Sequence, residues 1–147
     1  MKPLTDVQIQ RMLQDRRFGG VINKDDLDRL DRKCYVANLD SEKGPGTHWV
    51  ALSNMNPLYC YYFDSFGCPP PEHLLKLMNA THKRVIWNKK VIQSLATDSC
   101  GEFCVMFLQL LMKGMTPPEI LGRFHGPKQS ESILKKYYIA SGYIHDV

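Results

Sequence analysis

The sequence contains no unbroken apolar run of the ~18 residues that a membrane-spanning helix requires. It also has no internal repeat, no low-complexity segment and no linker-like stretch. Residues 1–17 are charged and amphipathic, whereas a secretory signal peptide carries an unbroken apolar core. We therefore expect a protein that does not enter membranes and is not secreted.

The cysteine pattern argues against a disulfide scaffold and against a structural metal site. Five cysteines, an odd number, are spread from Cys34 to Cys104, whereas small disulfide-stabilised domains have even numbers. Cys100 and Cys104 lie one helical turn apart, but no C-x-x-C or H-x-x-x-H pair supplies further ligands, so we expect no metal. The cysteines are expected to be thiols in a reducing, intracellular compartment, with Cys34, Cys60 and Cys68 in structural roles.

The remaining composition is typical of one globular domain. Of the 147 residues, 44% are hydrophobic and 23% are charged, which is close to ordinary globular usage. We predict a single domain over residues 1–147 that is monomeric. The net charge of +4 is a mild basic excess, which is compatible with weak nucleic-acid binding.

Hydrophobic periodicity and turn signals predict helices and strands that mix without a regular βαβ alternation. Helices are expected over residues 5–16, 23–30, 69–78, 100–113, 117–122 and 129–141, and strands over 34–39, 48–53, 58–63 and 84–87. The motif FGGV at 18–21 is expected only to end the first helix, and the turn-rich residues 41–46 to join the first two strands. The expected fold class is α+β, with a small, largely antiparallel sheet packed against helices and a central buried helix.

The stretch TDSCGEFCVMFLQLLM places a thiol at the start of that central helix. Ser99 and Glu102 fit a capping box, which puts Cys100 in the first turn, and the rest of the helix is almost wholly apolar. The positive end of the helix dipole favours a thiolate there, and the backbone N–H groups can hold an oxyanion. The alternative is that Cys100 is only a small apolar residue entering the core, which is the role we expect for Cys104.

A nucleophilic cysteine needs a base and an orienting group. His48 opens the strand HWVALS, and the return strand LYCYYFD ends on Asp64. If the strands pair around a connection near Met55 and Asn56, His48 and Asp64 are directly opposed, with Cβ atoms ~5 Å apart. The alternative is an ordinary aspartate before a turn, and a one-residue slip in register would separate the pair. The other histidines are expected to be structural or exposed: His73, His82, His125 and His145.

An oxyanion donor is expected from the segment before the central helix. Gln93 lies seven residues before Cys100, ahead of the loop SLATDS, which could return its amide to the thiol. The chain thus offers His48, Asp64, Gln93 and Cys100 in that order as the groups of a papain-like site.

These motifs together resemble the adenovirus-type processing proteases, or adenains, and more distantly the ubiquitin-like-protein proteases that process SUMO. The residues concerned are GTHWVAL, YCYYFDSFG and the glutamine before SCGEFCVMFL, within residues 17–112. The resemblance implies a small α+β cysteine-peptidase domain with a Cys-His-Asp triad. By position, it gives Cys100 as the nucleophile, His48 as the base, Asp64 as its orienting group and Gln93 as the oxyanion donor. Trp49 would line the substrate cleft.

The resemblance also implies a function. Such enzymes are endopeptidases that cleave precursor proteins, here virion structural proteins, at small or glycine-containing sites, and they act in the virion and in the host nucleus or cytoplasm. No cofactor is expected to be required, although family members can be stimulated by DNA or by a short peptide, for which no residue here assigns a site.

Some features leave other functions open. Asp64 matches the SUMO-type enzymes, whereas adenovirus enzymes usually have Glu; the spacing from Gln93 to Cys100 follows the adenovirus type. The alternatives are a protease that removes SUMO or ubiquitin-like proteins, and a binding module that keeps the cleft without cutting.

Overall fold

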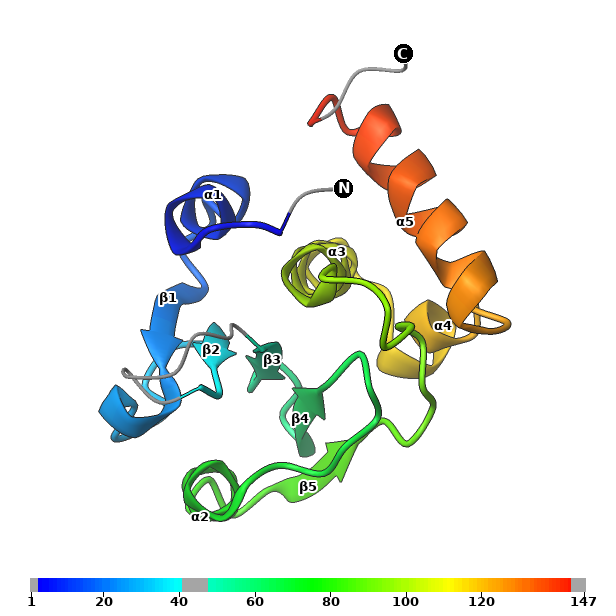
Figure 1. Cartoon of the computed structure of the whole chain (residues 1–147). Helices are drawn as coiled ribbons and strands as arrows, with labels where there is room; N and C mark the ends of the chain where they lie inside the picture. Colours follow the sequence, from blue (N-terminus) through cyan, green and yellow to red (C-terminus); the bar gives the residue numbers. More distant parts are fainter. Residues whose placement is uncertain (1–2, 41–47, 144–147) are drawn as a thin grey trace.

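The computed structural model describes residues 3–40 and 48–143, and in it a five-stranded sheet carries helices on both faces (Figure 1). The strands are β1 (Phe18–Asn23), β2 (Cys34–Asn38), β3 (Trp49–Ser53), β4 (Tyr59–Phe63) and β5 (Arg84–Trp87). The helices are α1 (Asp6–Met12), α2 (Glu72–Asn79), α3 (Cys100–Met112), α4 (Pro117–Leu121) and α5 (Pro127–Ala140), with a 3-10 turn, η1 (Lys24–Asp26). The predicted α+β class is confirmed.

The sheet is mixed rather than largely antiparallel. Its strands lie in sequence order; β2, β3 and β4 form an antiparallel centre, and β1 and β5 join the two edges in parallel. The parallel edges arise because each edge strand is reached through a long connection, which for β5 contains α2, whereas a tight hairpin would make the pairing antiparallel. As a result, the carboxyl-terminal ends of β4 and β5 lie next to each other, on the same side of the sheet.

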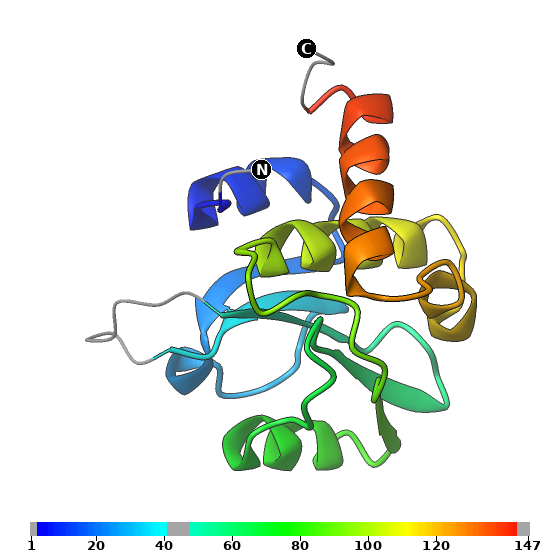
Figure 2. The same ribbon diagram turned by 45° about the vertical axis from the view of Figure 1, so that its right-hand side comes forward.

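Side chains that alternate along the strands divide the core into two parts. Val36, Ala51 and Phe63 face the helices α1, α3, α4 and α5, whereas neighbours such as Leu52 and Tyr62 face α2. Figure 2 shows this division, with α3 and α5 on one side of the sheet and α2 on the other. The period of two along each strand thus produces hydrophobic surfaces on both faces.

Helix α3 is the buried centre of the larger part of the core, as its sequence predicted. The ring of Phe107 stacks on Phe63 with ring centroids 4.3 Å apart, and the residues of α3 from Cys100 to Leu108 are all buried. Cys104 is fully buried within this cluster, which confirms its packing role. The helix is thereby fixed on the sheet, and its first turn lies beside the start of β3.

Two local predictions were wrong. The FGGV segment is not merely a helix stop, because it enters β1 and pairs with β2; a Cβ at Gly19 would overlap the ring of Tyr35. Of the helix expected over 23–30, only the 3-10 turn η1 forms. Leu27 takes an extended conformation and is buried in the part of the core that lies between the sheet and α2. The predicted turn over 41–46 lies outside the described residues.

Within the residues that the structure describes, none of the helices has the length and apolar character needed to span a membrane.

Candidate active site

Cys100 begins α3 at the point where the helix approaches β3. Its side chain is 5% exposed, and the backbone N–H of Trp49 donates a hydrogen bond to Sγ over 3.4 Å. Gly101 permits this approach, since a Cβ there would lie 3.2 Å from Cδ1 of Trp49. The small residue after the cysteine therefore lets the strand backbone reach the sulfur.

The capping box predicted at Ser99 and Glu102 is wrong. Ser99 has no side-chain bond to the helix, and its hydroxyl instead donates to Oε1 of Glu131 on α5 over 2.5 Å. The carboxylate of Glu102 is buried and has no hydrogen-bond partner among the described residues. The tertiary contact with α5 therefore replaces the local cap, and the hydroxyl of Ser99 makes no hydrogen bond to the first turn of α3.

The structure brings His48 and Asp64 together, but not by direct opposition. Nε2 of His48 lies 3.0 Å from Oδ1 of Asp64. The strand register pairs Ala51 with Phe63, a shift of two residues from the register that would oppose His48 and Asp64. His48 directly precedes β3 and Asp64 directly follows β4, so the two side chains meet beyond the ends of the strands rather than across a paired register.

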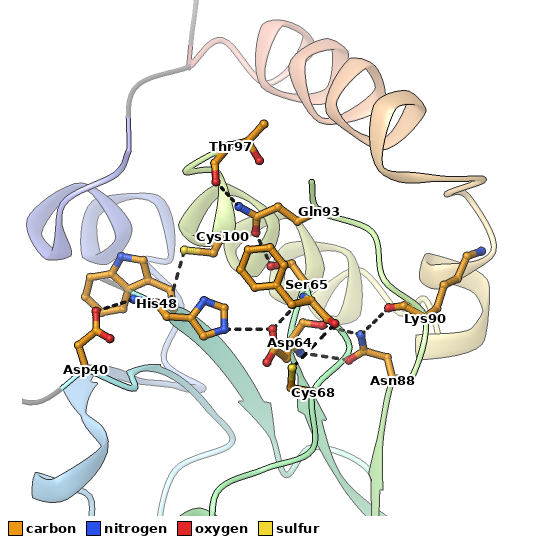
Figure 3. A network of polar contacts seen from close by, with 12 residues as sticks. Asp40, His48, Asp64, Ser65, Cys68, Asn88, Lys90, Gln93, Thr97 and Cys100 are labelled. Carbon is orange, nitrogen blue, oxygen red and sulfur yellow. Dashed lines mark hydrogen bonds and ion pairs between the residues drawn. The ribbon is translucent and has the colours of Figure 1, made fainter. Parts of the chain in front are cut away.

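The backbone and ring of His48 are held by neighbouring residues (Figure 3). The carboxylate of Asp40 accepts the N–H of His48 over 3.1 Å, and the carbonyl of His48 accepts the N–H of Leu39 over 2.9 Å. The ring of Phe66 lies 5.1 Å from the imidazole, centroid to centroid. These contacts fix the imidazole between Asp64 and the thiol.

The environment keeps His48 protonated. Burial by itself would lower the pKa of His48, but the hydrogen bonds to Asp64 and Cys100, together with their negative charges, outweigh it and raise the pKa to about 9. Since Nε2 contacts Asp64, Nδ1 is the ring nitrogen left for the sulfur. The imidazole is therefore positively charged at neutral pH and lies beside the sulfur of Cys100.

Asp64 is fixed by a turn and by Asn88. The N–H of Phe66 donates to Oδ1 of Asp64 over 2.8 Å. Asn88 bonds both backbone groups of Asp64: its Oδ1 accepts the N–H over 3.0 Å and its Nδ2 donates to the carbonyl over 2.6 Å. Asn88 was not predicted from the sequence. It directly follows β5, just as Asp64 directly follows β4, and the carboxyl ends of these two parallel strands lie next to each other.

Gln93 lies beside the loop that leads to Cys100, with its amide held at both ends. Oε1 accepts from the hydroxyl of Ser65 over 2.5 Å, and Nε2 donates to the carbonyl of Thr97 over 3.0 Å (Figure 3). An amide nitrogen carries two hydrogens, so one of them remains for another acceptor. Ser65 was also missed, because a serine in a turn carries no sign of its distant partner.

The side chain of Trp49 is placed differently from the expected cleft wall. It is 5% exposed and belongs to the core beneath α3, next to Gly101. A large aromatic ring that is buried in this way stabilises the core, whereas the wall of a substrate cleft would have to face solvent. What Trp49 presents to Cys100 is its backbone N–H.

The other cysteines lack comparable surroundings. All five lie in the described residues and none forms a disulfide. Burial raises the pKa of Cys34 to about 12 and that of Cys60 to about 11, and it also raises the pKa of Cys104. Cys68 is exposed, so it is not the core residue that a structural role would require. The described residues contain no group of three or more potential metal ligands.

The remaining histidines lie away from Cys100 and Asp64 or outside the described residues. Nε2 of His73 lies 2.8 Å from the carbonyl of Leu27, and His82 occupies a turn with φ +60°. His125 precedes α5 at the surface, and His145 lies outside the described residues. His48 is thus the histidine that the fold brings to a cysteine and a carboxylate.

An α+β domain with a cysteine at the start of its buried helix, next to a histidine and a carboxylate, has the arrangement of a cysteine protease. Comparison of the chain with known proteins points to one group of these enzymes. The chain is 34% identical over 110 residues to the protease of human adenovirus B serotype 3, and the match covers 64% of this chain and 50% of that protein. It is 30% identical over 112 residues to the protease of bovine adenovirus C serotype 10, covering 65% and 54%. The chain spans about half the length of these curated relatives.

Solved structures share the fold at low identity. The ASFV pS273R protease matches with a TM-score of 0.66 and 14% identity, covering 90% of this chain and 66% of that one. The central domain of the uncharacterized Lpg1148 protein from Legionella pneumophila matches with a TM-score of 0.54 and 13% identity, covering 96% of each. No protein-family model matches the chain.

Proposed function

We propose that this chain is a cysteine endopeptidase domain that cleaves virion precursor proteins at small or glycine-containing sites. The observation that carries the proposal is the meeting of Cys100 with His48 and Asp64, three residues from separate parts of the sequence. The similarity to adenovirus proteases supports the reaction class and the viral setting. Action in the virion and in the host nucleus or cytoplasm follows from the same similarity.

In the proposed mechanism, the thiolate of Cys100 attacks the scissile carbonyl and forms a tetrahedral intermediate. The backbone N–H of Cys100 and the second amide hydrogen of Gln93 donate to its oxyanion. His48 then transfers its proton to the leaving amine, and the thioester remains. His48 then takes a proton from water as the water oxygen attacks the thioester; the C–S bond breaks, the acyl product leaves as a carboxylic acid, and the thiolate of Cys100 beside protonated His48 is restored. Asp64 holds the imidazole and stabilises its positive charge throughout.

Removal of SUMO or ubiquitin-like proteins is the second candidate function. It is favoured by one observation, that the orienting residue is Asp64 rather than Glu. Both candidates use the same acyl-transfer chemistry, and they differ only in the protein that is cut. Weak nucleic-acid binding, a monomeric state and activation by DNA or a peptide remain predictions from the sequence.

The experiment that tests the proposal incubates the wild type and Cys100→Ala with the structural proteins encoded beside the chain, and maps the cuts by mass spectrometry. Cuts next to paired glycines that disappear in Cys100→Ala are expected. Cys68→Ala is the matched control, because that cysteine is exposed and not part of the proposed machinery. Cuts confined to SUMO or ubiquitin tails would favour the second candidate, and cleavage by Cys100→Ala at the wild-type rate would exclude both.

A binding module without activity gives a different result. A proposed nucleophile beside a protonated histidine should be alkylated by iodoacetamide near neutral pH, faster than the exposed thiol of Cys68. If Cys100 reacts no faster than Cys68 and no substrate is cut, the domain binds without cleaving.

A further inference from the structure

The orientation of the Gln93 amide depends on two partners, the hydroxyl of Ser65 and the carbonyl of Thr97. The carbonyl of Thr97 can only accept, so the NH₂ group of Gln93 must face it. The hydroxyl of Ser65 then donates to Oε1 over 2.5 Å. Ser65 is 0% exposed and Gln93 is 1% exposed, so water does not readily replace the hydroxyl of Ser65.

Ser65 is itself held in place by the backbone of the segment that carries Gln93. Its carbonyl accepts the N–H groups of Ile92 and Gln93 over 2.9 and 3.0 Å. It directly follows Asp64 in a turn closed by the bond from the N–H of Gly67 to the carbonyl of Asp64 over 2.8 Å. One turn thus places a carboxylate against His48 and a hydroxyl against Gln93 (Figure 3).

We propose that Ser65 is a positioning residue that keeps the NH₂ group of Gln93 directed to the loop before Cys100, where its second hydrogen serves the oxyanion. The inference rests on the proposed function. Without the hydroxyl, Oε1 of Gln93 is buried with no donor, so the amide rotates toward other partners. The variant should therefore bind the oxyanion more weakly, whereas the nucleophilicity of Cys100 should be unchanged.

Two reagents separate these effects. A peptide aldehyde ending in glycinal forms an S–C bond with Cys100, and the carbonyl π electrons become an oxyanion or, once protonated, a hydroxyl. Iodoacetamide also forms an S–C bond with Cys100, but iodide leaves and no oxyanion develops. The measurements use a Cys68→Ala background, because the exposed thiol of Cys68 would also react.

Ser65→Ala is expected to weaken aldehyde binding by about tenfold, and to change the alkylation rate by less than about twofold. Gln93→Ala should weaken aldehyde binding further, and adding Ser65→Ala to it should change nothing more, because the hydroxyl acts through that amide. Ser130→Ala is the matched control: its buried hydroxyl donates to the carbonyl of Gly126 over 2.7 Å, within α5's first turn. It should leave both reactions unchanged.

Unchanged aldehyde binding in Ser65→Ala would overturn the inference, as would equal slowing of both reactions or losses that multiply with Gln93→Ala. If Ser65→Ala does not fold, Ser65→Cys supplies a weaker donor of similar size, and its aldehyde affinity should lie between those of the wild type and Gln93→Ala. Absence of any aldehyde adduct on Cys100 in the wild type would instead overturn the proposed function.

Discussion

Replacing Glu102 by glutamine should stabilise the protein in a pH-dependent manner. Glu102 lies two residues after Cys100 in the first turn of α3, is 1% exposed, and has no hydrogen-bond partner for its carboxylate oxygens among the described residues. Burial raises the pKa of Glu102 to about 7; the nearby backbone N–H groups of Glu102 and Leu4 oppose this shift, and the charge of Glu131 adds to it. The folded protein therefore binds this proton more tightly than the unfolded chain does.

The sign and the size of the effect follow from this difference. An acid whose pKa is higher in the folded state loses stability as the pH rises from about 4.5 to about 7, because the buried carboxyl must then ionise. At 1.36 kcal/mol for each pKa unit, the cost above pH 7 is about 3 kcal/mol. Glu102→Gln keeps the size of the side chain and removes the ionisation, so it should gain up to this amount at pH 8 and little at pH 4.5.

The assay is urea unfolding of the wild type and Glu102→Gln at pH 4.5 and pH 8. His48 also loses stabilising protonation as the pH rises from about 6.5 through about 9, but it does so in both proteins, so the difference between them isolates Glu102. Glu72→Gln, at an exposed glutamate of α2, is the control and should behave as the wild type. An equal difference between wild type and Glu102→Gln at both pH values would refute the reasoning.

Three further predictions concern the site. Asp64→Asn should lower the pKa of His48 from about 9, because the hydrogen bond and the charge of Asp64 are lost while burial still acts; an NMR titration of the ring measures this, and an unchanged pKa would contradict it. Gly67→Ala should destabilise the fold by about 1–3 kcal/mol more than Gly114→Ala in thermal unfolding, since both have positive φ but only at Gly67 would a Cβ meet a backbone oxygen, at 2.7 Å. Gln93→Ala should lower turnover by ~10²–10³ without abolishing it; wild-type turnover would remove Gln93 from the mechanism.

Local sequence patterns predicted elements whose signal lies within a short window. The strand Arg84–Trp87 was predicted with the observed bounds, and the central helix from Cys100 ended within a residue of its predicted end. Both signals are continuous runs of apolar residues next to turn residues. Patterns of this kind fail where a distant partner decides, as at Phe18, which joins a strand only because β2 lies beside it.

The sequence predicted that His48 and Asp64 would meet, but not the geometry of their contact. His48 and Asp64 were chosen because a hairpin could oppose them, and they do meet, although the register differs by two residues. They meet because each lies one residue beyond its strand, where the contact does not depend on direct opposition. Ser99, by contrast, was assigned to a local cap, and its hydroxyl bonds Glu131 from a helix much later in the chain.

The sequence by itself determined the α+β class, the buried helix and the chemical identity of the proposed reacting groups. These features depend on the residue types within short segments, which the sequence gives directly. Only the tertiary structure decided which groups orient them. Asn88 and Ser65 reach Asp64 and Gln93 through hydrogen bonds between segments more than twenty residues apart. Such bonds depend on strand order and on the burial that excludes water, and neither quantity is encoded in a local pattern.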